Sequence, residues 1–317
     1  MPAVQAMILA AGLGTRLWPL TADRGKPAVP FLGRPLIAGL AEWLGGHGFD
    51  RLVVNTHHQP ESIRRALVGL PGLQIAFSHE DQILGTAGGL ALARDRGLLD
   101  ATQPVLVVNG KLHTDLDLSA VVQSHTESGA AVTMVLRPNP SREHFREVKV
   151  DGPWVSGFGE GRIPSGPAPL LFTGIHILGP AVLAGLEPRF SDTVADVYPP
   201  LIIDRRVHAH LAPEGRWWEF STLRRYFELQ MIGVDSPQVI AGPGVILHPG
   251  AQLRRAILWE GVTVEDGAHL EEVVVGANVT VRSGERFRGG ALVRRDLVGG
   301  DDRGSVHGDR VLVPFEP

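Results

Sequence analysis

The sequence contains no cysteine in 317 residues, which excludes a disulfide framework, a thiolate metal site and a cysteine nucleophile. It also lacks an excess of positive charge: the formal net charge is -4, so broad nonspecific binding to nucleic acid is not expected. No apolar run approaches the roughly 20 residues that cross a bilayer, and no basic region of a secretion signal opens the chain. We expect a soluble, cytoplasmic protein that binds neither nucleic acid nor a membrane.

Short apolar runs alternate with amphipathic segments over most of the chain. This alternation is typical of an α/β fold, with a mostly parallel, Rossmann-like sheet and helices on both faces. A second domain is expected because single cores stop growing at roughly 250 to 300 residues. The expected strands are 5–9, 51–55, 74–78, 105–109, 131–136 and 171–177, and the expected helices are 37–46, 60–67, 87–94 and 118–128.

The last part of the chain repeats itself. Three rows align, GVILHPGAQLRRAILWE from Gly244, GVTVEDGAHLEEVVVGA from Gly261 and NVTVRSGERFRGGALVR from Asn278, each starting 17 residues after the last. A period of about 17 or 18 with branched apolar residues suits a β-helix with three short strands in each coil, and a meander of unrelated hairpins is the alternative. We predict domains 1–235 and 236–317, the second being a short β-helix with a C-terminal tail. Its open end or face is an expected contact between identical subunits.

A glycine loop follows the first predicted strand, in LAAGLGTRLWPLTADRGKPAVPFLGRPLI. Gly12 and Gly14 allow successive backbone N–H groups to converge on phosphate oxygens, and Arg16 adds a cation with forked donors. Lys26 adds a point charge on a segment stiffened by prolines. The loop lacks both the G-x-G-x-x-G dinucleotide pattern and the Gly-Lys-Ser/Thr of a Walker loop. An ordinary βα turn is the alternative to a polyphosphate cradle.

The order G-x-G-T-R, Pro-Leu-Thr, Lys-Pro-x-x-Pro resembles the sugar-1-phosphate nucleotidylyltransferases, also called NDP-sugar pyrophosphorylases. The similarity continues through NTHHQPESI, HEDQILGTAGGLALA, VVNG, FTGIHIL and WWEFSTLRRY. These enzymes join a nucleoside triphosphate to a sugar 1-phosphate and release pyrophosphate, usually with Mg²⁺. Several branches, including mannose-1-phosphate guanylyltransferases, carry a C-terminal left-handed β-helix. The resemblance thus implies that 1–235 is the catalytic domain.

The resemblance also implies roles for individual residues. It assigns Arg16 and Lys26 to catalysis, and we add Lys111 as a third catalytic candidate because it occupies a position where the family usually has an aspartate. The nucleotide-binding residues implied are Ala10, Ala11, Gly12, Gly14, Thr15, Arg16, Gly85, Thr86, Ala87, Gly88 and Asn109. The sugar-phosphate residues implied are Glu160, Arg162, Thr173 and Gly174. From the residues alone, Thr86 is equally well a helix cap, and a helix start still exposes N–H groups for binding.

Four positions depart from the family pattern. Lys111 stands where an aspartate usually follows Asn-Gly, and Glu219 stands where a second aspartate helps to hold Mg²⁺. Protonated lysine cannot ligate a metal ion and repels it. Glu160-Gly161-Arg162 replaces Glu-Lys-Pro, and Gly25 replaces a proline ahead of Lys26, which is expected to loosen the support of that lysine.

Three explanations are open. Lys111 and Glu219 together carry the same net charge as two carboxylates with Mg²⁺, so the ammonium can take the place of the metal at the α-phosphate. Alternatively, Mg²⁺ arrives with the nucleotide and is held by the phosphates and Glu219, with Asp115 or Asp117 as an additional candidate ligand. In the third, the protein binds a nucleotide or NDP-sugar without turnover, as a regulatory homologue. For Asp115 and Asp117, capping of the helix at Leu118 is the simpler interpretation. The base and the sugar are not determined by the sequence.

Overall fold

The computed structural model describes residues 4–159, 168–232, 239–299 and 303–316, and the chain divides into two compact units. The first comprises Met1–Gly12, Leu40–His57 and Gly69–Trp217, and the second comprises Leu13–Gly39, His58–Val68 and Trp218–Pro317. The predicted domain boundary at 235/236 lies outside the described residues.

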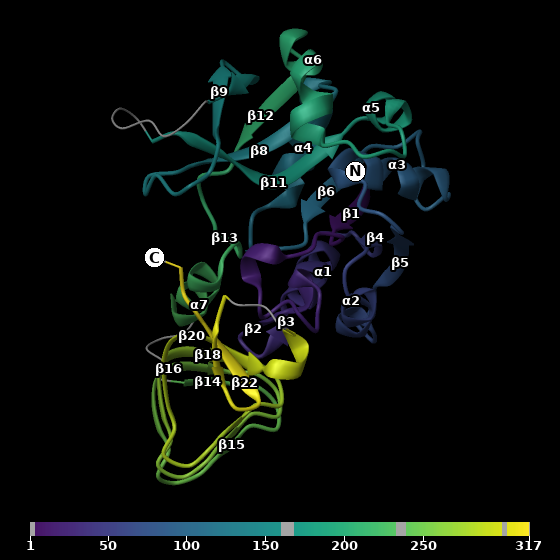
Figure 1. Ribbon diagram of the computed structural model, residues 1–317. Coiled ribbons are helices and arrows are strands. Elements are labelled where there is room, and N and C mark those ends of the chain that lie inside the picture. The colour runs from purple at the N-terminus through teal and green to yellow at the C-terminus, as the bar shows by residue number, and fades with distance from the viewer. Residues whose placement is uncertain (1–3, 160–167, 233–238, 300–302, 317) are drawn as a thin grey trace. The chain divides into compact units, whose positions relative to one another are not determined.

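The first unit is built on a nine-stranded sheet (Figure 1). In spatial order its strands are β5 (Gln74–His79), β4 (Arg51–Thr56), β1 (Gln5–Leu9), β6 (Val105–Asn109), β11 (Leu170–Leu178), β8 (Val132–Pro138), β12 (Val207–Leu211), β10 (Trp154–Phe158) and β9 (Glu147–Asp151). Central β1 reads QAMIL with its three middle residues buried, as expected for a strand covered on both faces. The α/β prediction is confirmed.

The prediction of a mostly parallel sheet is corrected, because the sheet is mixed. Strands β5, β4, β1 and β6 run parallel, but β11 is antiparallel to both β6 and β8. Strands β9 and β10 pair with Asp151 opposite Trp154, so only Gly152 and Pro153 connect them. A two-residue link permits an antiparallel pair alone, since a parallel crossover needs a dozen or more residues.

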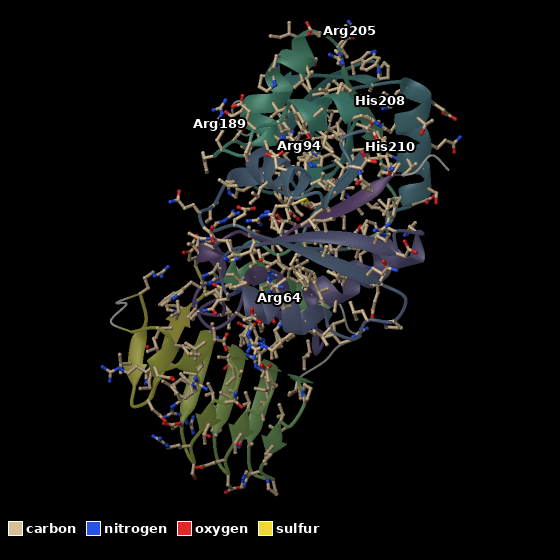
Figure 2. All side chains as sticks on the ribbon, turned by 90° about the vertical axis from the view of Figure 1, so that its right-hand side faces the viewer. Arg64, Arg94, Arg189, Arg205, His208 and His210 are labelled. Carbon is tan, nitrogen blue, oxygen red and sulfur yellow. The ribbon has the colours of Figure 1, made fainter. Side chains whose placement is uncertain are left out.

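The four predicted helices are present within two residues of their predicted bounds, and three further helices, α5 to α7, were not predicted. They are α1 (Leu36–Gly46), α2 (Pro60–Leu67), α3 (Gly85–Asp95), α4 (Leu118–Ser128), α5 (Pro180–Gly185), α6 (Tyr198–Ile203) and α7 (Leu223–Ile232), with short turns η1 (Thr15–Leu17), η2 (Lys26–Ala28), η3 (Thr193–Val197) and η4 (Arg295–Leu297). The end of α5 is closed by Arg94 of α3, whose Nη1 donates to the carbonyl oxygens of Leu183, Ala184 and Leu186 (Figure 2). Among the described helices, none is both long and apolar enough to span a bilayer.

The second unit contains the repeats as stacked parallel strands. Gln252 pairs with His269 and His269 with Arg286, so each step of the ladder advances the chain by one 17-residue row. One ladder runs β14 (Val239–Ala241), β16 (Gln252–Leu258), β18 (His269–Val275) and β20 (Arg286–Arg294), and is continued by antiparallel β22 (Arg310–Pro314) and β21 (Ser305–His307). The other runs β15 (Ile246–Leu247), β17 (Thr263–Val264) and β19 (Thr280–Val281). The remaining short strands are β2 (Pro30–Phe31), β3 (Arg34–Pro35), β7 (Leu112–Thr114) and β13 (Trp217–Glu219).

We call these stacked turns, residues 239–294, the coil. Its interior is filled by the aligned apolar positions, including Val264, Leu270 and Val281 at 1% exposure or less. Leu247 occupies the matching position of the first row but is 45% exposed. Its strand β15 pairs with β17 and stands at the end of the three-strand ladder, so its side chain has a neighbouring row on one side. The left hand of the coil stays a prediction.

Candidate functional site

A chain of buried polar groups ties the glycine loop to the start of α3 in the first unit. Ala10 N donates to Asn55 Oδ1 at 2.6 Å, and Asn55 Nδ2 donates to Glu80 Oε1 at 2.7 Å. The other carboxylate oxygen, Glu80 Oε2, accepts from Leu84 N at 2.9 Å. Asn55 is 3% and Glu80 1% exposed, so breaking either contact would leave a buried polar group unsatisfied.

Sequence reasoning assigned no role to Asn55 or Glu80, although both lie within segments that carry the family resemblance. The signal was available: Asn55 is the next-to-last residue of β4 and Glu80 directly follows β5, where the carboxyl ends of parallel strands meet at one edge of the sheet. A polar residue at the end of such a strand faces that edge. Their side chains position the backbone of Ala10, which was predicted to bind nucleotide.

The start of α3 is held by a loop distant in sequence. Ala87 N and Gly88 N both donate to the carbonyl oxygen of Ser191, at 3.0 and 3.4 Å. Thr86 does not cap the helix, because the N-cap residue is Leu84 and no side chain caps it. Instead the Thr86 hydroxyl donates to Asp192 Oδ2 at 3.0 Å. The backbone groups expected to meet the base are therefore partly engaged within the protein, and their nucleotide-binding role stays a prediction.

Asn109, the last residue of β6, lies against Gly174 of β11. Gly174 has φ +79, and a Cβ at this position would collide with Asn109 Nδ2, so the predicted pair Asn109 and Gly174 is in contact only because Gly174 lacks a side chain. Thr173 is 1% exposed and its hydroxyl donates to Val135 O at 2.8 Å, beside a bulge in the β11–β8 pairing. Its hydroxyl is thus engaged in the sheet. Glu160 and Arg162 lie outside the described residues.

The two aspartates after Lys111 have structural partners. Asp117 is the N-cap of α4, with Oδ1 accepting from Ser119 N at 2.9 Å, as the capping interpretation predicted. Asp115 accepts from the backbone N of Arg216 and lies 3.5 Å from that residue's guanidinium. Lys111 itself is half-buried in the turn between β6 and β7. Each aspartate thus has a carboxylate oxygen engaged within the protein, and a metal-binding role for either stays a prediction.

The second unit holds the rest of the glycine loop. Gly14 adopts the left-handed conformation, φ 69, and begins η1, in which Thr15 and Arg16 are exposed. A Cβ on Gly14 would lie 2.9 Å from Thr21 Cγ2 and 3.0 Å from Lys26 Cβ. The missing side chain therefore lets the loop pack directly on the segment that carries Lys26.

Lys26 is held firmly in the second unit. It begins η2, is 8% exposed, and its Nζ donates to Ser221 O at 3.4 Å. Glu219 is also buried, at 4% exposure, in β13. Gly25 N donates to Ser62 Oγ at 2.8 Å, which supports the backbone beside Lys26, and the expected loosening stays a prediction. A proline has no N–H and cannot form this hydrogen bond. Glycine at position 25 therefore gives a more flexible backbone than proline would, but it allows the hydrogen bond to Ser62.

We predict that Gly25→Pro destabilises the fold by about 2 kcal/mol, although φ −64 at this position suits proline. The substitution removes the donor to Ser62 and brings a Cβ to 2.8 Å from Ile63 Cδ1. Denaturant unfolding measures the loss, and Ser62→Ala, which removes this hydrogen bond and the one from Ser62 Oγ to Gln59 O but adds no crowding, should show about half of it. A proline variant as stable as the wild type would contradict the anchoring role.

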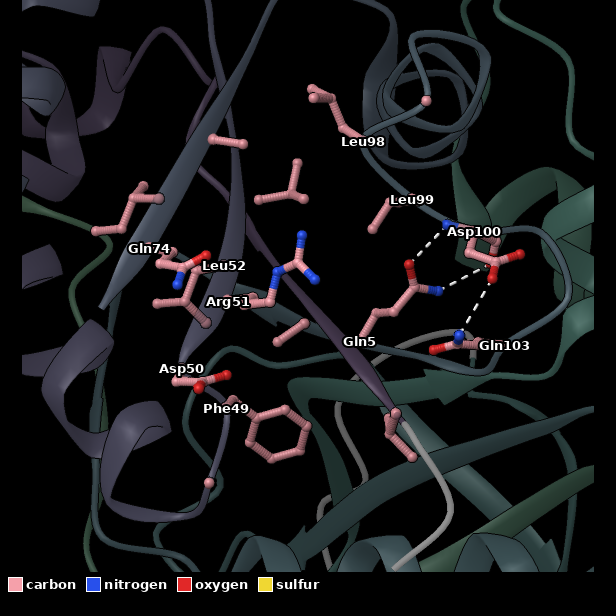
Figure 3. A pocket seen from close by; sticks show the side chains of 17 residues that line it. Gln5, Phe49, Asp50, Arg51, Leu52, Gln74, Leu98, Leu99, Asp100 and Gln103 are labelled. Carbon is pink, nitrogen blue, oxygen red and sulfur yellow. Dashed lines mark hydrogen bonds between the residues drawn. The ribbon is translucent and has the colours of Figure 1, made fainter. Parts of the chain in front are cut away.

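A separate cavity of about 660 Å³ lies at the amino-terminal ends of β1, β4 and β5 in the first unit (Figure 3). Gln5 and Gln103 on its wall bind Asp100, with Gln5 Nε2 donating to Asp100 O at 2.9 Å and Gln103 Nε2 donating to Asp100 Oδ2 at 3.1 Å. None of the residues predicted to bind nucleotide lines this cavity. These residues follow the carboxyl ends of the strands instead.

The fold and the loop define a class: an α/β protein whose central strand runs directly into a glycine loop, the arrangement used for phosphate binding. The family model for nucleotidyl transferase matches residues 5–233. The chain belongs to the nucleotidyl transferase family.

Individual relatives agree with this membership. The chain is 32% identical over 258 residues to mannose-1-phosphate guanyltransferase of Schizosaccharomyces pombe, covering 75% of this chain and 68% of the relative. It is 30% identical to probable mannose-1-phosphate guanylyltransferase 2 of Arabidopsis thaliana, covering 74% and 66%. A UTP–glucose-1-phosphate uridylyltransferase of Synechocystis is also 30% identical, with 78% and 68% covered. The chain thus spans about two thirds of the length of these curated relatives.

A solved structure shares the fold. HddC from Yersinia pseudotuberculosis, crystallised with GMP-PN, superposes with a TM-score of 0.63 at 19% identity, covering 73% of this chain and 100% of that chain. At this identity the likeness concerns the fold alone.

Proposed function

We propose that this protein transfers a nucleotidyl group from a nucleoside triphosphate to a sugar 1-phosphate, giving an NDP-sugar and pyrophosphate. The observation that carries the proposal is the family match over residues 5–233, with the glycine loop at the end of central strand β1. In this reaction a sugar-phosphate oxygen attacks the α-phosphorus and pyrophosphate leaves in line. The protein's work is to position two polyanions and neutralise their charge.

We assign roles to residues of each unit separately. In the first unit, Ala10 and Ala11 stand at the end of β1 with backbone positions fixed through Asn55, and we assign them to the nucleotide. In the second unit, exposed Arg16 is assigned to the leaving pyrophosphate and Lys26 to the phosphates at the reacting centre. The assignments rest on the family resemblance of the motifs, and the hydrogen bonds around Lys26 support the required rigidity.

Lys111 is assigned to the α-phosphate as a fixed cation. Among the described residues no three His, Cys, Asp or Glu side chains are grouped as a metal site, so an Mg²⁺ ion would arrive with the nucleotide, and Glu219 stays its candidate protein ligand. Asp115 and Asp117, the carboxylates next along the chain, are engaged by Arg216 and Ser119. No step of the proposed mechanism is therefore routed through a protein-bound metal, and the ammonium group supplies the stabilising charge.

Pyrophosphate release tests the proposal. We expect release from GTP or UTP in the presence of a hexose 1-phosphate, with mannose 1-phosphate and glucose 1-phosphate tried first because the relatives named above act on these. The assay is run with Mg²⁺, with Mn²⁺ and with EDTA. No release from any pair in a broad panel of triphosphates and sugar phosphates would refute nucleotidyl transfer.

A second candidate is a regulatory homologue that binds a nucleotide or NDP-sugar without turnover. The lysine at position 111, where the family pattern has an aspartate, favours it. This candidate requires nucleotide-sugar binding that survives EDTA, measured as a rise in melting temperature, together with absence of turnover. Robust pyrophosphate release would eliminate it.

Finer features of the coil belong to the same proposal. We assign it a left-handed β-helical course, supported by its 17-residue parallel register, and contact between identical subunits through the exposed first row, where Ile246 is 56% and Leu247 45% exposed. Sedimentation of Ile246→Lys against wild type measures the second assignment. An unchanged oligomeric state would contradict it.

A further inference from the structure

Arg24, two residues before Lys26, is enclosed by charged and aromatic groups of the second unit. Its Nε and Nη2 donate to the Asp23 carboxylate at 2.9 and 3.1 Å, and Nη2 also donates to Glu260 Oε1 at 2.7 Å. The guanidinium carbon lies 4.5 Å from the ring centroid of Trp259. With its side chain only 14% exposed, Arg24 combines two ion pairs with a cation–π contact.

The two coil residues that hold Arg24 are themselves anchored. Trp259 follows β16, is 2% exposed, and its backbone N donates to Val275 O of the next row at 2.9 Å. Its Nε1 donates to Tyr226 Oη of α7 at 3.0 Å, and Tyr226 Oη donates to Pro30 O. The indole ring is thus fixed by the coil on one side and by the segment beyond Lys26 on the other.

Contacts outside the coil also hold the segment from Arg24 to Lys26. Before it, Thr21 O and Ala22 O accept from His58 and Gln59, and within it Gly25 is tied to Ser62. The coil contacts this segment directly through Trp259 and Glu260, which both bind Arg24. Because Lys26 begins a short η2 turn immediately after Gly25, rotation of Arg24 out of its place would move the backbone from which Lys26 projects.

We propose that the coil positions Lys26 for phosphate binding through a clamp formed by Trp259 and Glu260 on Arg24. The three are positioning residues, and the inference rests on the proposed function, which makes Lys26 a phosphate ligand. The coil then acts on the chemistry of each single chain, independently of any contact between subunits. Misplacement of a catalytic group by about an ångström can cost up to about 100-fold in rate, so loss of the clamp should appear in turnover.

Glu260→Gln tests the clamp, with Glu272→Gln as the matched control. Glu272 also pairs with an arginine, Arg255 Nε at 3.3 Å, and both glutamate side chains are 41% exposed, but Glu272 lies within the coil away from Arg24. We expect Glu260→Gln to lower kcat about tenfold while KM for the sugar phosphate and the melting temperature stay at the control's values. Trp259→Phe should lower kcat in the same direction.

Equal kcat in Glu260→Gln and Glu272→Gln would overturn the clamp, and so would a loss that merely follows melting temperature. If the wild type releases no pyrophosphate, nucleotidyl transfer fails, and the clamp is then judged by the dissociation constant of GTP or UTP measured on the same variants. A constant about fivefold weaker in Glu260→Gln than in the control supports it. Equal constants refute it.

Discussion

Replacing Lys111 with methionine is expected to lower kcat for pyrophosphate release about 100-fold or more, the loss found when one fixed group that stabilises transition-state charge is removed. Methionine keeps the length and apolar stem of lysine and removes the ammonium. Lys111 stands in the turn after β6, at the sheet edge where ligands of α/β folds bind. The measurement is steady-state pyrophosphate release at saturating substrates.

The chain offers a clean control, because its three lysines are Lys26, Lys111 and Lys149. Lys149 is exposed on β9, so Lys149→Met should leave kcat unchanged. Lys111→Asp separates the explanations of the lysine: loss of activity in Mg²⁺ supports the ammonium as the working cation. A gain of metal-dependent activity would instead indicate that Lys111 impairs an ancestral metal site, and it would overturn the assignment of Lys111 to catalysis.

Acid is expected to destabilise the first unit through His176. Burial lowers the pKa of this histidine to about 3, whereas the unfolded chain titrates near its ordinary value of about 6.5. Between these values the unfolded state binds a proton that the folded state does not, so stability is complete above the unfolded pKa and falls as the pH falls. The expected loss from pH 7 to pH 4 is about 3 kcal/mol from this residue.

Denaturant unfolding at several pH values measures the effect. In His176→Asn, which can still hydrogen-bond the Tyr198 hydroxyl that contacts His176 Nδ1, the pH dependence should be flatter by that amount. His248→Asn, at an exposed position of the coil, should keep the wild-type slope. Burial also lowers the pKa values of His125, His208 and His210, so some acid sensitivity remains. A His176→Asn slope equal to wild type would contradict the prediction.

Local patterns in the sequence predicted the parallel half of the sheet well. Strands β1 and β6 begin and end at the predicted residues, because a continuous apolar run between turn residues has few other solutions in an α/β chain. The repeat was equally accessible, since its period appears directly in the pairing register. Helix α4 and its Asp117 cap followed from residue type and spacing alone.

Contacts between segments far apart in sequence could not be predicted in this way. No local pattern shows that Ser191 would engage the start of α3, or that Glu80 would reach back to Asn55. Thr86 illustrates the competition: its hydroxyl has a choice between capping its own helix and bonding Asp192, and tertiary contact decides. The antiparallel direction of β11 likewise depends on its pairing with β6 and β8, which lie far from it in the sequence.

The 17-residue register of the coil limits how this part of the chain can change in length. A deletion of one residue inside a row would turn inward valines such as Val264 and Val281 toward solvent, whereas duplication of a whole row would preserve every inward position. Growth by complete rows after Val275 would leave Trp259 and Glu260 beside Arg24, but it would displace β20, whose Ala291 and Val293 share a core with Phe227 of α7. The module can therefore change in length only by whole rows, and the rows that hold Arg24 and α7 must keep their places.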